Sequence, residues 1–333
     1  MISIVLALLV GGIFLAFAGK SPAEVYLAML EGAVGSKFAA SETLVKVIPL
    51  GLCALGVSLA FRVQLWNIGA EGQFFMGAMA ASWVALNNPD GSRWTVLPAM
   101  FLAAVAAGGL WGLLPAIPRA FWKVNETITT LMLNYVAIIW VQYLVYGPWK
   151  DPKGFNFPLT ATFGTGGTLP TLGTTRIHFG IFFVLIAALV VYVVLRYTVW
   201  GFQLKVVGES QNAANYAGMS IVKTVLMVMF ASGALAGIAG MAEVAGITQR
   251  LQDSISPGYG YSAIIIAWLS RLNPWSILLV SFLFGGLLTS GSSLQSLGLP
   301  VASVSMLQGL ILFFVLGGEI FANYRITLRK GGN

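Results

Sequence analysis

The sequence predicts an all-α integral membrane protein that crosses the bilayer several times. Of the 333 residues, 58% are hydrophobic and only 9% are charged, and the mean hydropathy is +0.86. A soluble domain carries about 25% charged residues, so most of this surface must contact lipid. The apolar runs are roughly 17 to 25 residues long and do not alternate, as transmembrane helices require, whereas barrel strands would be near 10 residues with a period of two.

Ten apolar runs predict about ten transmembrane helices. The runs are 1–18, 44–61, 68–87, 94–117, 127–146, 177–195, 221–247, 259–270, 275–293 and 301–317. The run 259–270 is short, which indicates either a half-helix or a helix that continues past Pro274 with a kink.

Polar stretches between these runs indicate loops within a single transmembrane domain, residues 1–333. Residues 19–43 and 147–176 are expected outside the cell, and 196–220 are expected in the cytoplasm. Within the first, residues 22–38 favour an amphipathic helix at the outer interface.

Both chain termini are expected inside the cell. Arg119, Lys123 and the basic tail Arg325–Lys330 directly flank membrane runs, as cytoplasmic basic residues do. Residues 4–18 resemble the core of a signal peptide, but no positive charge precedes them, which favours an uncleaved helix. A longer N-terminus also remains possible.

Several function classes are excluded by composition. The formal charge is +7, but the basic residues are scattered, so no run follows nucleic-acid phosphates. Cys53 and His178 are the single residues of their types, so we expect no disulfide, metal cluster or cofactor. Gly19-Lys20-Ser21 lacks the glycine that a phosphate-binding loop needs five positions earlier, and no nucleophile–base pair is found. The chain is therefore not expected to be an enzyme.

The first candidate site lies between two membrane runs, at residues 61–73. Its polar side chains, Asn67, Glu71 and Gln73, suit a polar, uncharged solute. Gly69 and Gly72 let the backbone leave helical geometry. A charge inside the membrane usually faces a cavity or a partner, so Glu71 indicates a pathway wall. The alternative is an interfacial Glu71 that pairs with Arg62.

A second segment, residues 232–243, combines close-packing glycines with an acid. Gly233 and Gly237, like Gly108 and Gly112, are spaced for close contact between helices. Glu243 could line a path or cap a polar network.

A third segment, residues 200–218, indicates a short cytoplasmic helix between membrane helices. Residues 209–216 suit such a helix, and Gly218 could end it. A soluble motor could push on this helix, or the segment could be a plain interfacial connector.

Together these segments resemble the permease subunit of bacterial ATP-binding cassette (ABC) importers, in the superfamily for branched-chain amino acids and simple sugars. The resemblance covers about residues 22–320 and is strongest to the nucleoside-type branch. It is carried by Ala60-Phe61-Arg62, Asn67-Ile68-Gly69-Ala70-Glu71-Gly72-Gln73, Pro118-Arg119-Ala120, Leu131-Met132-Leu133-Asn134-Tyr135, Gly208-Glu209-Ser210, Ser232-Gly233-Ala234-Leu235-Ala236-Gly237 and Gly258-Tyr259-Gly260.

The resemblance implies a type II importer-like bundle in the bacterial plasma (inner) membrane, working by alternating access. Its expected partners are ABC ATPase subunits, a second and different permease subunit, an external solute-binding (lipo)protein and membrane lipid. The expected solutes are nucleosides or related ribosylated or sugar-like molecules. The pathway residues are then Asn67, Glu71, Gln73, Asn134 and Glu243, and the ATPase-coupling residues are Gly208, Glu209, Ser210, Ala213 and Ala214. The alternative is a proton-coupled secondary transporter that uses Glu71 or Glu243.

Overall fold

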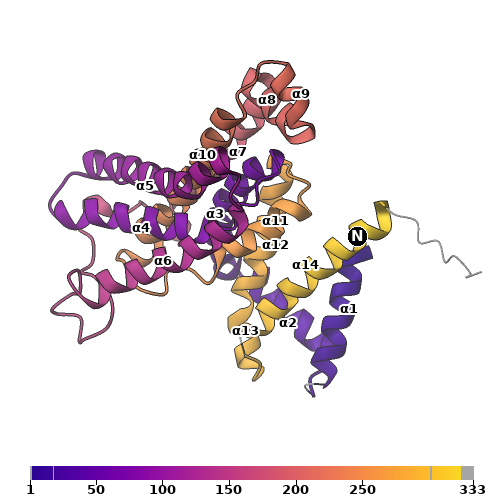
Figure 1. Ribbon diagram of the computed structural model, residues 1–333. Coiled ribbons are helices and arrows are strands. Elements are labelled where there is room, and N and C mark those ends of the chain that lie inside the picture. Colours follow the sequence, from indigo (N-terminus) through magenta and orange to yellow (C-terminus); the bar gives the residue numbers. More distant parts are fainter. Residues whose placement is uncertain (1, 18, 301, 324–333) are drawn as a thin grey trace, which may run out of the picture. The chain divides into compact units, whose positions relative to one another are not determined.

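A computed structural model describes residues 2–17, 19–300 and 302–323. Within these ranges the chain is helical with irregular connections, and it forms isolated bridges instead of strands, so the all-α prediction is confirmed (Figure 1). The helices are α1 (Ile2–Phe17), α2 (Pro22–Val34), α3 (Lys37–Arg62), α4 (Ala70–Asn87), α5 (Arg93–Trp122), α6 (Glu126–Tyr146), α7 (Gly180–Tyr197), α8 (Val199–Glu209), α9 (Gln211–Tyr216), α10 (Ile221–Glu243), α11 (Tyr259–Leu269), α12 (Pro274–Thr289), α13 (Gly291–Ser296) and α14 (Ala302–Asn323). A 3-10 turn, Thr165–Gly167, and a π-helical turn, Val244–Thr248, complete the elements.

A helix occupies each of the ten predicted runs, but the count of ten membrane spans is not confirmed. In the described ranges six helices are long and apolar enough to cross a bilayer, or seven if α1 and α2 are one bent span. Helix α11 has only 11 residues, and α4 opens with polar residues that include Glu71 and Gln73. A straight span needs about 20 predominantly apolar residues, which neither helix provides.

Large apolar side chains are exposed along α6 and α7, as lipid contact requires. On α6 they include Ile128, Val136 and Ile139, and on α7 Ile186 and Val190, each more than half exposed. In water such a continuous apolar face would be unfavourable, so this surface is suited to a membrane or to a partner helix.

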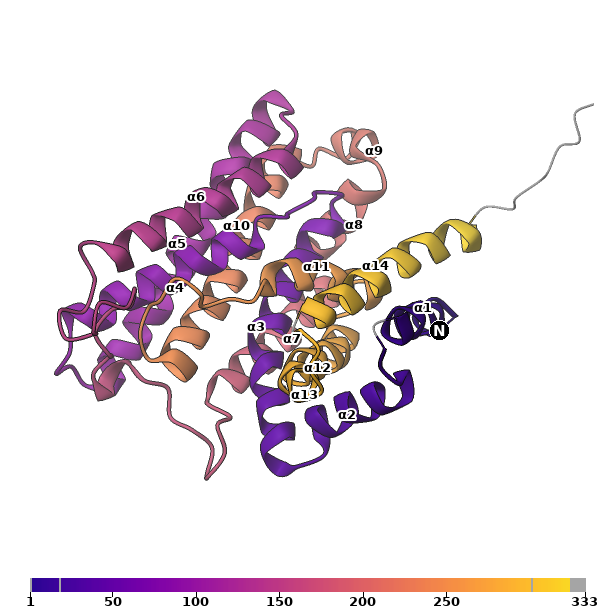
Figure 2. The ribbon, with the colours of Figure 1, turned by 90° about the horizontal axis from the view of Figure 1, so that it is seen from below.

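The described contacts divide into two units. The larger covers residues 44–285 and is built around α4, α5 and α10, which run side by side in both views (Figures 1 and 2). A Cβ at Gly108 would collide with the carbonyl oxygen of Gly233, and one at Gly77 would collide with the backbone of Gly237. These contacts confirm the predicted close packing at the glycine pairs, because only a residue without a Cβ lets the two helix backbones come this close.

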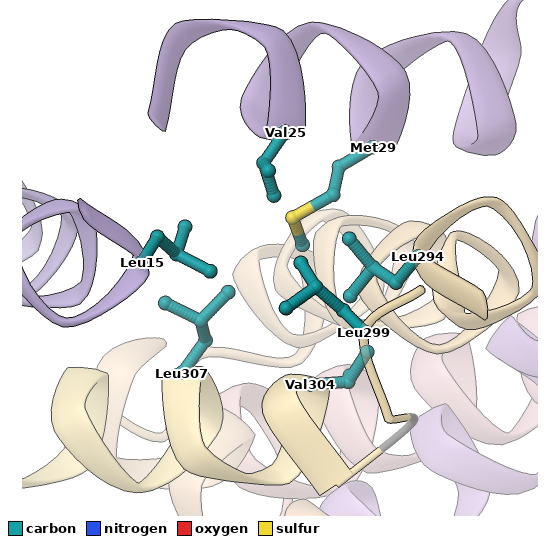
Figure 3. Close-up of a cluster of buried hydrophobic side chains, with 7 residues drawn as sticks. All are labelled: Leu15, Val25, Met29, Leu294, Leu299, Val304 and Leu307. Atoms are coloured by element: carbon teal, nitrogen blue, oxygen red, sulfur yellow. The ribbon is translucent and has the colours of Figure 1, made fainter. Parts of the chain in front are cut away.

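The smaller unit combines residues 1–43 with residues 286–333, of which 1, 18, 301 and 324–333 lie outside the described ranges. Its core joins α1, α2, α13 and α14 through seven buried apolar side chains (Figure 3). They are Leu15, Val25, Met29, Leu294, Leu299, Val304 and Leu307. The predicted helix at 22–38 is present as α2, and its buried residues, Val25 and Met29, both point into this core.

The long polar stretch predicted at 147–176 folds back onto the end of α10. Backbone N–H groups of Thr160, Phe163 and Leu169 donate to the carbonyl oxygens of Leu251, Gln249 and Ala245, at 2.8 to 2.9 Å. The three acceptors lie within and just after the π-helical turn, so these hydrogen bonds hold the loop against the segment that follows Glu243.

Candidate functional site

The candidate site begins at the break between α3 and α4. Helix α3 ends at Arg62, whose guanidinium donates to the carbonyl oxygen of Leu272 at 2.6 Å. Gln64 adopts a left-handed conformation (φ 58°), and the chain then runs without helical structure to Ala70. The backbone therefore leaves helical geometry as predicted, in a segment whose Asn67 is fully buried.

Asn67 and Gln73 form a reciprocal amide pair across this break. The Asn67 Nδ2 donates to Gln73 Oε1 at 3.0 Å, and the Gln73 Nε2 donates to Asn67 Oδ1 at 3.1 Å. Asn67 also donates to Ser232 Oγ on α10 at 2.8 Å and accepts from the backbone N–H of Gly69 at 3.0 Å. The hydrogen-bonding groups of Asn67 are already occupied by these internal hydrogen bonds. A solute could therefore bind the amides only if its own hydrogen bonds replaced the internal ones.

Asn134 closes the same break from α6. Its Oδ1 accepts from the Gly72 N–H at 2.8 Å, and its Nδ2 donates to the Ile68 carbonyl oxygen at 2.8 Å and to the Tyr261 hydroxyl at 3.3 Å. Backbone groups that leave a helix inside a bilayer need such partners, because water is absent.

Glu71 lies where the N-terminal ends of α4 and α11 meet. Its Oε2 accepts from the backbone N–H of Gly260 at 2.6 Å, and the carboxylate is also hydrogen-bonded by Ser256. A Cβ at Gly260 would collide with the Glu71 backbone, so the two helix ends touch. Helix N-termini favour negative charge. The alternative pairing with Arg62 is not what the structure shows, since Arg62 binds the Leu272 carbonyl oxygen.

Glu243 belongs to a second polar cluster at the C-terminal end of α10. Its Oε1 lies 3.9 Å from the Lys46 ammonium of α3, and that ammonium donates to the Tyr259 hydroxyl at 2.7 Å. The Lys46 nitrogen also lies 5.4 Å from the centre of the Tyr259 ring. The two clusters are adjacent in the chain, because Tyr259 precedes the Gly260 that binds Glu71.

The predicted coupling segment forms two short helices, α8 and α9, beyond the ends of α7 and α10 (Figure 1). Ser210 separates them and caps α9, accepting from the Ala213 N–H at 3.2 Å. The predicted stop at Gly218 is present, with φ 74°. Ala213 is exposed, but Ala214 is fully buried and so faces the protein itself.

Four of the five predicted pathway residues are joined through the break before α4, and Glu243 lies in the neighbouring cluster. Sequence reasoning missed Ser232, Tyr259 and Lys46. A signal existed for Lys46, since a charge inside the apolar run 44–61 is unfavourable without a partner. Ser232 and Tyr259 carry no comparable signal, because their polar contacts depend on residues far away in the chain.

One groove lies elsewhere and is apolar. Its volume is about 440 Å³, and it is lined by α5, α8 and α10 through residues that include Leu113, Trp200 and Phe230. No residue of the two polar clusters lines it. Among the described residues no three Cys, His, Asp or Glu side chains gather as metal ligands would.

Known proteins share this sequence along its length. The glucose ABC transporter permease protein TsgB13 of Haloferax volcanii is 38% identical over 100% of this chain and 91% of its own length. The guanosine ABC transporter permease protein NupP of Bacillus subtilis is 33% identical over 100% of this chain and 96% of its own. NupQ, a second guanosine ABC transporter permease protein of Bacillus subtilis, is 27% identical over 73% of this chain and 78% of its own.

The family described as the permease component of branched-chain amino acid transport systems matches residues 39–316. The match includes both polar clusters and both helices of the predicted coupling segment. With its apolar helices and these relatives, the chain is an integral membrane protein and belongs to the family of branched-chain amino acid transport permease components.

Proposed function

We propose that this chain is the permease subunit of an ABC importer that carries a nucleoside, or a related ribosylated or sugar-like solute, into a bacterial cell by alternating access. The nucleoside assignment is supported by the relatives NupP and NupQ, and the wider sugar-like class by TsgB13. The plasma membrane is the location that this role requires.

The observation that carries the proposal is the uncharged polar network around Asn67, Gln73, Asn134 and Ser232 inside an apolar bundle. Amides and hydroxyls offer both donors and acceptors, and they match a neutral solute that has many of each. Alternating access would open the network by moving α4 away from α6 or α10, so that a solute replaces the internal bonds.

The proton-coupled alternative requires a carboxylate that takes up and releases protons. Glu71 is less suited to that role, because its Oε2 is hydrogen-bonded at the N-terminal end of α11. The chain also belongs to a family of transport-system permease components, and a permease component driven by a separate motor needs no proton carrier of its own.

The proposed partners follow from the arrangement of the helices and from the relatives. The exposed side of α8 and α9 is the proposed docking surface for an ABC ATPase subunit. NupP and NupQ carry the same transporter name in one organism, which favours a second, different permease beside this chain. An external solute-binding protein would deliver the solute.

Reconstituted uptake tests the proposal. The chain, co-purified with its ATPase and second permease, is placed in proteoliposomes with the external binding protein, and radiolabelled guanosine uptake is measured with ATP or with a proton gradient. We expect uptake that needs ATP and is unaffected by collapse of the gradient, with competition by other nucleosides. Uptake driven by the gradient without ATP would overturn the importer assignment. If only glucose competes with guanosine, the transported solute is a hexose instead of a nucleoside.

A further inference from the structure

The apolar groove of the larger unit opens beside the proposed coupling segment. Leu113 and Ile117 line it from α5, Leu226 and Phe230 from α10, and Trp200 from the first turn of α8. Its volume of about 440 Å³ lies within the range of roughly 300 to 1,000 Å³ that is usual for ligand sites. Because these side chains are apolar, apart from the indole N–H of Trp200, a ligand of this groove must present hydrocarbon.

The two long helices that line the groove run antiparallel. A Cβ at Gly112 of α5 would collide with the carbonyl oxygen of Met229, and one at Gly108 would collide with that of Gly233, one turn farther along α10. The C-terminal end of α5 therefore lies beside the N-terminal end of α10. The groove extends toward these two ends, since Ile117 follows the contact on α5.

Aromatic side chains mark this end of the bundle as the level of a membrane interface. Phe121 and Trp122, at the C-terminal end of α5, are 60% and 71% exposed. Exposed tryptophans gather where lipid headgroups meet the hydrocarbon. On the expected topology this interface is the cytoplasmic one, since α10 starts directly after the segment 196–220. The groove therefore runs from the headgroups into the hydrocarbon of the inner leaflet.

An exposed lysine lies one helical turn from the groove, on the side of the interface. Lys223 is in the first turn of α10, and the lining residues Leu226 and Met227 follow it by three and four positions. Residues at this spacing share one face of a helix. Within the described ranges no acidic side chain lies within ion-pair distance of Lys223, so its charge is available to an anionic headgroup.

Trp200 supplies a second group that suits a lipid. Its Nε1 is buried and has no hydrogen-bond acceptor among the described residues, although it belongs to a side chain that lines the groove. A buried donor without an acceptor is unfavourable. The ester oxygens of a phospholipid lie between its phosphate and its acyl chains, and each of them can accept this hydrogen bond.

We propose that the groove binds one anionic phospholipid. An acyl chain packs against α5 and α10, the phosphate pairs with Lys223, and an ester oxygen accepts from the Trp200 N–H. The lipid then joins α8 to the two long helices. Its effect on coupling rests on the proposed function of α8, whereas its binding requires only that the chain lies in a membrane.

Photolabelling with a lipid tests the binding. The co-purified permease complex is placed in phosphatidylcholine nanodiscs that contain a small fraction of phosphatidylglycerol with a photoreactive group on one acyl chain, and labelled peptides are identified by mass spectrometry. We expect label concentrated at residues 113–117 and 226–231, in excess of the label on the exposed apolar faces of α6 and α7. Unlabelled phosphatidylglycerol should compete for these positions, and the same amount of added phosphatidylcholine should not. Label spread evenly over the apolar surface would overturn the proposal.

Two pairs of variants separate the headgroup from the acyl chain. Lys223→Gln should weaken labelling by phosphatidylglycerol about 5-fold, the effect of one lysine at an anionic membrane surface. Lys205→Gln is its control, because Lys205 is exposed on α8 and lies 4.0 Å from Glu209. Met227→Trp should fill the groove and exclude the chain, whereas Met132→Trp, at an exposed site on α6, should leave the label unchanged.

Other occupants of the groove give different results. If a cysteine at position 227, in a Cys53→Ala background, cross-links to the second permease and the groove takes up no lipid label, a protein surface covers it and the proposal is wrong. Equal labelling of the wild type and Lys223→Gln would also overturn it, and this exposed substitution decides even if Met227→Trp fails to assemble. A complex that does not transport guanosine but shows the groove label would refute the proposed solute and leave the lipid site standing.

Discussion

The side-chain amide of Gln64 donates a hydrogen bond of 2.7 Å to the backbone carbonyl oxygen of Gly208. Gln64 lies in the turn that opens the break before α4, and Gly208 lies at the end of α8, in the proposed coupling segment. A Cβ at Gly208 would also collide with the carbonyl oxygen of Arg62. The helices of the proposed coupling segment therefore contact the turn that leads to Asn67, and a displacement of α8 would reach that turn directly.

Gln64→Leu should weaken this connection while the fold is retained. The variant removes one hydrogen bond at an exposed position, so we expect at most about 1 kcal/mol of lost stability. Stimulation of ATP hydrolysis by loaded binding protein should fall several-fold in the assembled complex. Gln295→Leu, at an exposed site on α13, is the control, and the complex that contains it should show the same stimulation of ATP hydrolysis as the wild-type complex. Unchanged stimulation in Gln64→Leu would show that coupling does not use this contact.

Glu71→Ala should reduce uptake at least about 10-fold while the complex still assembles. The change leaves the Gly260 N–H at the start of α11 without its acceptor, in a region that excludes water. Glu31→Ala, at an exposed site on α2, is the matched acidic control. Uptake is measured at equal amounts of assembled complex, as judged by gel filtration. Normal transport by Glu71→Ala would show that Glu71 is not needed in the pathway.

Two neighbouring alanines of α9 should respond differently to a bulky side chain. Ala213 is exposed, so Ala213→Trp should leave the permease folded, weaken its association with the ATPase and abolish solute-stimulated hydrolysis. Ala214 is fully buried, so Ala214→Trp should overpack the interior and reduce stability by about 1 to 3 kcal/mol. The measurements are ATPase pull-down and thermal unfolding. Wild-type ATPase binding by Ala213→Trp would exclude α9 from the docking surface.

The orientation of the chain can be tested with single cysteines in a Cys53→Ala background. Gln211 and Lys153 are both exposed, and they belong to segments expected on opposite sides of the membrane. An impermeant thiol reagent should label a cysteine at 211 only from the cytoplasm and a cysteine at 153 only from outside. The reverse pattern would invert the topology and exclude the coupling role of α8 and α9.

Acid should destabilise the permease through its single histidine. His178 is buried just before α7, and burial lowers its pKa from 6.5 to about 4. Its Nδ1 accepts from the Gly180 N–H at 3.1 Å, which requires an unprotonated nitrogen, and the ring packs on Gly246. The unfolded chain binds the proton more readily between these pH values. Stability should therefore fall as the pH drops from about 6.5 to about 4, by roughly 1.4 kcal/mol per unit.

Thermal unfolding across this pH range checks the effect of His178. The wild type should show an unfolding temperature that decreases below about pH 6.5. His178→Gln removes the titrating group, so its unfolding temperature should vary less over the same interval. Equal pH profiles for the two proteins would contradict the assignment.

The helices within the ten apolar runs were predicted well, because an apolar run is a local signal. The boundaries were less accurate where a helix starts with polar residues. Helix α3 begins at Lys37, seven residues before the run at 44–61, and the hydroxyl of Thr43 in this extension donates to the Ala33 carbonyl oxygen. Hydropathy does not reveal a helical turn whose polar groups are satisfied by another helix.

The candidate site was predicted by residue type but not by partner. Asn67, Glu71 and Gln73 were recognised because polar residues beside glycines interrupt an apolar pattern. The Gly260 that binds Glu71 lies 189 residues away, and its contribution is a backbone N–H that every residue type except proline carries. Only the three-dimensional packing of α4 against α11 selects it.

The contact between Gly108 of α5 and Gly233 of α10 also limits how the protein can evolve. A Cβ added at either glycine would collide with the carbonyl oxygen of the other. Both positions already hold the smallest residue. A larger residue on one helix cannot be accommodated by a smaller one on the other. Second-site suppressors of Gly108→Ala should therefore be absent at position 233, and the two positions should remain fixed together as the solute preference of the transporter diverges.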